Sequence, residues 1–236
     1  MRTQHKNTAY FDQLLMEIQR KAAQIKDLHE ALLAGRDLIV PGYELQISTN
    51  LILQLTIRYT RGDALADIAG LYPEIAERFI KSWNPRNVNH AHLFDVLTLG
   101  VLLDAPAETF ARIGALVDRA RVRDFLVDYF LAWRVPRPLH PVLKYQTYRP
   151  YNGLRQLAEA PPEAAPARLQ EYLQKDWYIK SNTDIAYNSH PEGDAHGSFV
   201  GYWSFGAGAV AKIRGLDDAA CQDSEYYPYD MVHWRA

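Results

Sequence analysis

Apolar residues recur at helical spacing near the N-terminus of the chain. One face of this first segment collects Phe11, Leu14, Leu15, Ile18, Ile25, Leu28 and Leu32. The spacing predicts a long amphipathic helix from about Thr8 to Ala34, which Gly35 ends. A second stretch, from Tyr43 to Arg61, is apolar on several sides, and we expect it to form a central helix.

Prolines and capping residues divide the rest of the chain into shorter predicted helices. Asp63 can cap the next helix, which Pro73 should kink or split. Further helices are expected at residues 89–103, 106–118, 122–133, 151–160, 165–187 and 199–214. Prolines make residues 134–150 irregular, and glycines with a proline make residues 188–198 a loop.

Strand signals are nearly absent from the sequence, because alternation of apolar and polar residues is not sustained anywhere. We therefore predict an all-α fold, a compact multi-helix bundle of about nine or ten helices with no substantial sheet. A soft boundary near residues 119–122 separates an N-terminal helical region, 1–120, from a C-terminal helical region, 121–236. Both are expected to belong to one compact unit.

Composition indicates a globular protein and narrows its surroundings. The 236 residues are 48% apolar and 23% charged, which argues against disorder. No apolar run is long enough to span a membrane, and the first residues lack the apolar core of a secretory signal. The single cysteine cannot form an internal disulfide. We expect a cytoplasmic protein that makes no membrane contact.

Charge is unevenly distributed along the chain. The whole sequence carries −2, but residues 184–236 hold eight acids and three bases, a balance of −5. Such a bias is common on a solvated face, and the alternative is a surface that meets a basic partner. The net charge does not suggest direct nucleic-acid binding.

No familiar catalytic motif is present, and no cofactor is expected. The sequence lacks a Gly-rich phosphate loop and a Gly-x-Ser-x-Gly elbow, and acids near Cys221 disfavour a reactive thiolate. Two alternatives stay open. A nucleic-acid-binding regulator would use the basic run at residues 119–123, which internal ion pairs also explain. A metal-dependent hydrolase would use a loop with the candidate ligands His190, Glu192, Asp194 and His196, and a solvated turn is the favoured explanation of this loop.

The segment from Phe199 to Asp230 carries the most information about function. Phe199, Trp203, Val210 and Ile213 are expected on one face of the last helix. Small residues at 206–209 and 211 occupy the opposite face, where they let another helix approach closely. Tyrosines at 226, 227 and 229 need hydroxyl partners when buried. These features predict a C-terminal clasp and protein binding rather than catalysis.

Four pieces of this segment together resemble the C-terminal signature of the PoNi-type immunity proteins. They are Gly201–Phe205, Ala209–Ile213, Leu216–Asp218 and Tyr227–Asp230. The combination is specific, although each piece alone is weak. Asp176-Trp177-Tyr178 and His190 upstream also look similar, whereas the N-terminal helices agree only in being helical. One departure is Gly206, because the family usually has an acid at this position.

The resemblance implies a protein that binds a polymorphic nuclease toxin in the cytosol and blocks it. Such toxins resemble restriction-endonuclease-type DNases and are commonly delivered by type VI secretion. A nuclease is basic where it grips phosphate, so an acidic inhibitor suits that surface. The inhibitor either plugs the active site or blocks DNA from beside it.

The same resemblance separates two groups of residues, and no catalytic or metal-binding residue is expected. The expected toxin contacts are the acids Asp184, Glu192, Asp194, Asp218, Asp223 and Glu225. The signature residues expected to be structural are Tyr202, Trp203, Asp217, Tyr227, Pro228 and Asp230.

Overall fold

The computed structural model describes residues 1–33, 40–185, 187–191 and 199–236, and these residues form helices and no strand. The predicted all-α class is confirmed. The α-helices are α1 (Thr8–Leu33), α2 (Pro41–Arg61), α3 (Leu65–Ala69), α4 (Tyr72–Ser82), α5 (His90–Leu102), α6 (Ala107–Arg119), α7 (Phe125–Ala132), α8 (Arg149–Glu159), α9 (Ala165–Glu171), α10 (Phe205–Arg214) and α11 (Tyr229–His233). A π-helical turn, η1 (Tyr172–Trp177), follows α9, and a 3₁₀ turn, η2 (Ala219–Cys221), precedes α11. None of the described helices is long and apolar enough to cross a membrane.

Packing divides the chain into two units. The first comprises Met1–Asn89 and His190–Gly201, and the second comprises His90–Ser189 and Tyr202–Ala236. The boundary expected near residue 120 falls inside the second unit. The expected helix end at Gly35 lies outside the described residues.

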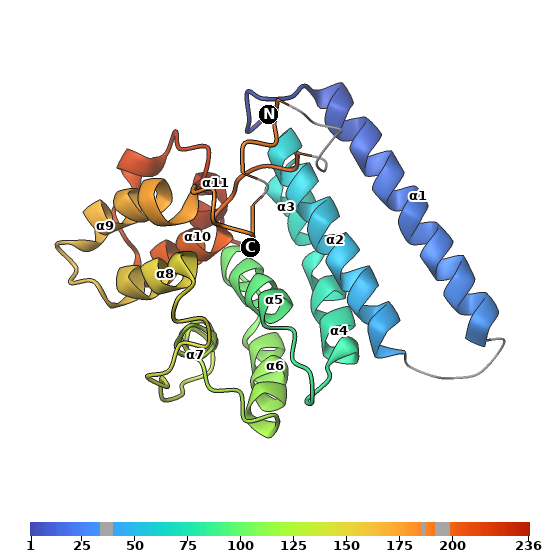
Figure 1. The fold of residues 1–236 in the computed structure, drawn as a ribbon, viewed down its shortest axis with the longest axis horizontal. Helices are drawn as coiled ribbons and strands as arrows, with labels where there is room; N and C mark the ends of the chain where they lie inside the picture. Colours follow the sequence, from blue (N-terminus) through green and yellow to red (C-terminus); the bar gives the residue numbers. More distant parts are fainter. Residues whose placement is uncertain (34–39, 186, 192–198) are drawn as a thin grey trace. The chain divides into compact units, whose positions relative to one another are not determined.

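In the first unit, α2 packs against both α1 and α4 (Figure 1). Leu55 and Ile57 of α2 and Ile75 of α4 are fully buried, as the apolar pattern of a central helix predicts. Phe199 is joined to α1 of this unit by a hydrogen bond, since its backbone N–H donates to the Tyr10 hydroxyl at 2.7 Å.

Asp63 does not cap α3, so that expectation was wrong. The residue before α3 is Ala64, and no side chain caps the helix. The Asp63 carboxylate instead accepts hydrogen bonds from Arg58 at 2.8 Å and from Arg61 at 2.6 Å. Charge-assisted bonds to two guanidinium groups are stronger than one bond to a neutral backbone amide. The expected break at Pro73 is confirmed, because this proline lies in the first turn of α4.

In the second unit, the apolar helix α5 packs against α7 and α10, and α10 also contacts α8 and α11. Small residues permit this approach, as expected. A Cβ atom added at Gly206 would lie 2.9 Å from Leu154 Cδ2, and one added at Gly208 would lie 2.7 Å from Pro228 Cγ. Gly206 therefore leaves no room for the acid that the resembled family usually carries there.

Two predicted helix boundaries in the second unit were wrong. Helix α10 begins at Phe205 rather than Phe199, because the Ser204 hydroxyl caps it and the Ser204 N–H donates to the Tyr226 carbonyl at 2.7 Å. Phe199 and Trp203 are therefore not on its apolar face. The helix expected over residues 165–187 ends at Trp177, whose carbonyl accepts from the Asn182 side chain at 2.8 Å.

Candidate functional site

Buried hydrogen bonds join three segments of the second unit. The Trp177 indole N–H donates to the Tyr202 carbonyl at 2.8 Å, close to the Ser204–Tyr226 backbone bond. Tyr202 is 2% exposed and Trp203 is 8% exposed. These aromatic side chains form the interior against which the last part of the chain is fixed.

Asp218 is the centre of a second buried contact. Its Oδ2 accepts the Tyr227 hydroxyl at 2.6 Å, and its Oδ1 lies 2.9 Å from His233 Nε2. Asp218 is 3% exposed and Tyr227 is 1% exposed. Burial, and then the Asp218 charge, raise the pKa of the Tyr227 hydroxyl. Among the predicted toxin contacts that the structure describes, Asp218 is therefore the one that lies in the interior.

Asp176 fixes the π-helical turn η1, which Tyr178 follows directly. Its carboxylate accepts from Arg149 Nε at 2.9 Å and from Arg168 Nη2 at 2.5 Å. Gly153 provides the space, because a Cβ atom there would lie 2.6 Å from Asp176 Oδ2. Two opposite charges neutralise a carboxylate that is 7% exposed, so the turn is held at both oxygens.

Tyrosine rings stack where this turn ends. Tyr178 and Tyr226 lie face to face, with ring centroids 4.3 Å apart and an interplanar angle of 14°. The Tyr187 ring joins this stack, with its centroid 4.7 Å from that of Tyr178, and Tyr187 is 42% exposed. Burial, and then the negative charge of Glu225, raise the pKa of Tyr226, so the Glu225 carboxylate lies close to this ring.

A hollow of about 320 Å³ adjoins Tyr226. One side comes from α9 and η1, and the other from η2 and the loop at 223–226. Asp223 and Glu225 line it and are exposed. We call Tyr178, Tyr187 and Tyr226 together with Asp223 and Glu225 the acidic–tyrosine surface.

Asp184 follows on the same segment and is also exposed. The Tyr148 hydroxyl fixes its position, since it accepts from the Asp184 N–H at 3.3 Å and donates to Asn182 Oδ1 at 2.5 Å. Desolvation of the carboxyl group raises the pKa of Asp184 and of Asp95, that of Asp95 to about 7. The charge of Asp184 contributes to the shift in Asp95, so the two carboxyl groups lie near each other.

The remaining predicted residues have different surroundings. Asp217 is exposed and its Oδ1 accepts from the Ala219 N–H at 3.4 Å, while Asp230 lies in the first turn of α11. Pro228 is buried against α10. Glu192 and Asp194 lie outside the described residues.

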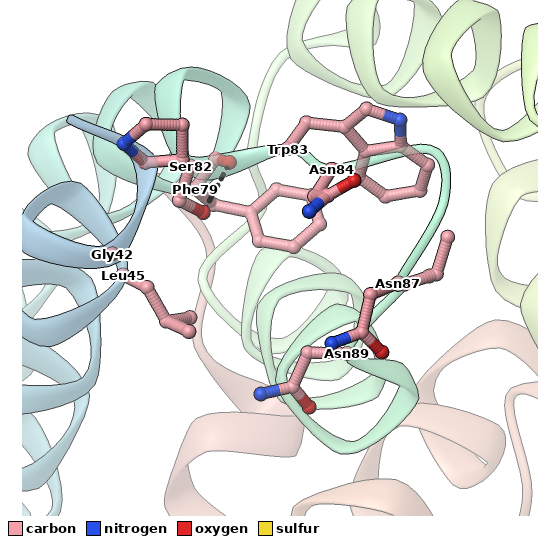
Figure 2. A pocket seen from close by; sticks show the side chains of 10 residues that line it. Gly42, Leu45, Phe79, Ser82, Trp83, Asn84, Asn87 and Asn89 are labelled. Atoms are coloured by element: carbon pink, nitrogen blue, oxygen red, sulfur yellow. Dashed lines mark hydrogen bonds between the residues drawn. The ribbon is translucent and has the colours of Figure 1, made fainter. Parts of the chain in front are cut away.

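A pocket in the first unit offers no catalytic group. It measures about 150 Å³ and lies between the start of α2 and the segment after α4. Figure 2 shows Leu45, Phe79 and Trp83 around it, with asparagine side chains at its rim. The Ser82 hydroxyl donates to the Phe79 carbonyl at 2.7 Å, so it is not activated by a base.

Cys221 also has the wrong setting for a nucleophile. It is 3% exposed, and burial, and then the charge of Asp218, raise the pKa of its thiol to about 11. A thiolate, the reactive form, is therefore strongly disfavoured near neutral pH. This agrees with the effect expected from the nearby acids.

The metal-site hypothesis rests mainly on residues that the structure does not describe, namely Glu192, Asp194 and His196. His190 is described, and its ring stacks on His5 with centroids 3.8 Å apart. Within residues 1–33, 40–185, 187–191 and 199–236, no three metal-ligating side chains gather closely enough to hold an ion.

Most arginines near the basic run are engaged by acids of the same unit. Arg134 pairs with Asp104 at 2.7 Å, and Arg137 lies 2.9 Å from Asp128. Arg155 pairs with Glu159 at 3.0 Å. These pairs do not include Arg119, Arg121 or Arg123, for which the described residues show no ion pair, so both interpretations of the run stay open.

Comparison with known proteins points to one family. Residues 122–231 match the family of C-terminal regions of PoNe immunity proteins (PoNi), a span that includes α7 to α11 and the acidic–tyrosine surface. The chain is also similar in fold to the crystal structure of protein PA2201 from Pseudomonas aeruginosa. The TM-score is 0.69 at 19% identity, over 95% of this chain and 87% of that chain. No curated protein matches the sequence.

Proposed function

Because residues 122–231 belong to the C-terminal family of the PoNe immunity proteins, we propose that this chain is an immunity protein that binds and neutralises a cognate nuclease toxin. It acts by direct contact in the cytoplasm and performs no reaction of its own. The toxin is a DNase effector delivered by type VI secretion. The family match over α7 to α11 is the observation that carries this proposal.

The second unit suits a binding role because its buried carboxylates form hydrogen bonds and ion pairs that stabilise the fold. Asp176 is neutralised by two arginines, and Asp218 accepts from Tyr227 and contacts His233. Groups used in this way give a rigid frame, and a rigid frame loses little conformational entropy on binding.

The exposed acids of this unit supply the contact charge in the proposal. Asp184, Asp223 and Glu225 all reach solvent on the C-terminal part of the chain that carries −5. A nuclease surface that binds DNA is rich in Lys and Arg. Opposite charge speeds the encounter and helps to orient the two proteins. A stable complex of this kind buries on the order of 1,600 Å².

Co-expression tests the proposal. Cells producing the nuclease domain of the toxin encoded beside this protein should stop growing, and production of this chain should restore growth. A nuclease domain inactivated at its catalytic centre should co-purify with the chain at equal stoichiometry. An unrelated nuclease domain of similar charge serves as the control and should be neither rescued nor bound. Absence of both rescue and complex formation with the cognate domain would overturn the proposal.

A further inference from the structure

We propose that the acidic–tyrosine surface receives an arginine side chain of the toxin, which lies against the Tyr178–Tyr226 stack with its charge beside Glu225 and Asp223. This inference rests on the proposed function and names the contact through which it operates. Arginine is favoured over lysine because its planar guanidinium stacks on aromatic faces and pairs with carboxylates through two bonds.

The aromatic part of this surface is open to a partner. Tyr187 exposes 42% of its surface although it lies 4.7 Å from Tyr178. Tyr178 and Tyr226 are half-buried, so each keeps part of its ring accessible. Tyrosine contributes a large contact area at low entropic cost and is enriched among residues that dominate binding energy.

The charge of the surface selects a cation. Asp223 and Glu225 are exposed and line the 320 Å³ hollow beside Tyr226. Across the part of the chain that the structure describes, Asp223 has no ion-pair partner. Lys175, in the π-helical turn that forms one side of the hollow, is engaged by Glu171 at 3.2 Å. A guanidinium group attracted to the carboxylates lies beside the Tyr226 ring, which lines the same hollow.

The surface is also held in place before binding. The Tyr226 carbonyl accepts from Ser204, and Trp177, directly before Tyr178, donates to the Tyr202 carbonyl. Both rings of the stack therefore extend from backbone that is fixed to the buried core. A partner does not have to order these side chains, and this preserves affinity.

Affinity measurements with the catalytically inactive nuclease domain test the inference. Three variants probe the surface: Tyr187→Ala, Glu225→Lys and the double charge reversal of Asp223 and Glu225. Glu163→Lys is the matched control, because Glu163 is an exposed acid of the same unit that lines no part of the hollow. Circular dichroism and thermal unfolding establish that each variant is folded.

The double reversal should weaken binding by about 30-fold or more, the range of a residue that dominates an interface. Tyr187→Ala should weaken it by about tenfold, and Glu163→Lys should leave it unchanged. Exchanging the exposed arginines of the nuclease domain for alanine one at a time should identify one whose loss makes Glu225→Lys harmless.

The possible results distinguish the proposed arginine contact from the proposed immunity function. Wild-type binding that persists at full strength in all three surface variants overturns this inference and leaves the immunity function standing. Absence of wild-type binding overturns the proposed function itself. Loss of binding in the surface variants with no coupling to any arginine overturns the choice of arginine as the occupant.

Discussion

Removing one buried hydroxyl group distinguishes a structural role of Asp218 from a role in toxin contact. Tyr227→Phe keeps the ring and deletes only the group that donates to Asp218 Oδ2 at 2.6 Å. The carboxylate is 3% exposed, so water cannot replace the lost donor without a rearrangement. Hydrogen bonds to charged groups contribute about 1.5–3 kcal/mol, and we expect the free energy of unfolding to fall by that amount.

Urea unfolding followed by circular dichroism and tryptophan fluorescence measures this loss. Tyr229→Phe is the control, because it removes a hydroxyl from the same segment for which the described residues provide no hydrogen-bond partner. Its effect should stay within roughly 0.5 kcal/mol. A double-mutant cycle of Tyr227→Phe and Asp218→Asn isolates the coupling energy between these two side chains.

Toxin binding by the folded Tyr227→Phe variant completes the test. We expect unchanged affinity, since the hydroxyl lies in the interior, where Tyr227 is 1% exposed. A variant with unaltered stability and lost affinity would refute this reasoning and place the pair in the contact surface. A variant with unaltered stability and affinity would show that the bond contributes nothing to either.

Four further predictions concern titratable or closely packed groups. The pKa of Asp95 is raised from 3.8 to about 7 in the folded chain, so the folded chain binds this proton more strongly than the unfolded chain does. The free energy of unfolding should therefore fall as pH rises from 4 to 7. Asp95→Asn should remove this slope in unfolding measurements across pH. Burial lowers the pKa of Lys212 from 10.5 to about 8, so between pH 8 and 10.5 the unfolded chain binds more protons than the folded chain. The free energy of unfolding should therefore rise as pH rises through this range, and Lys212→Met should abolish the rise. Cys221 should resist iodoacetamide at pH 8 until the chain is unfolded, and rapid labelling of the native protein would contradict its burial. Gly153→Ala should cost about 1–3 kcal/mol in urea unfolding, because the new methyl group would meet the Asp176 carboxylate.

The periodic apolar pattern was sufficient for the fold class and for most helices. The end of α2, the separation of α3 and α4 and the small-residue packing of α10 all follow from local rules about apolar spacing, proline and glycine. These rules work because each concerns residues that are neighbours in the sequence.

The wrong expectations have a common cause in contacts between distant residues. Asp63 favours two arginines over the helix that it could cap. The start of α10 depends on Tyr226, and the end of the helix after α9 depends on Asn182. Sequence spacing contains no information about such partners, so helix ends are harder to predict than helix existence.

Burial also divides the acids of the C-terminal segment in a way that charge alone did not indicate. Asp217, expected to be structural, is exposed, whereas its neighbour Asp218, expected to contact the toxin, is buried; Asp223 and Glu225 are exposed. Net charge treats these acids alike, whereas the hydrogen bonds of Asp218 remove it from the surface.

In the C-terminal segment, a residue at the surface and a residue that fixes the fold are consequently neighbours in the sequence. Tyr226 presents its ring to the hollow, and Tyr227, the next residue, is bonded to Asp218 in the interior. The buried residue fixes the backbone from which the accessible ring extends. Under the proposed immunity function, a change in toxin specificity would require substitution of exposed side chains such as Glu225, while the buried bonds beneath them can stay the same. Substitutions that unfold the second unit and substitutions that change its partner should thus fall on adjacent residues, and a scan of residues 223–230 that measures both stability and affinity would reveal that alternation.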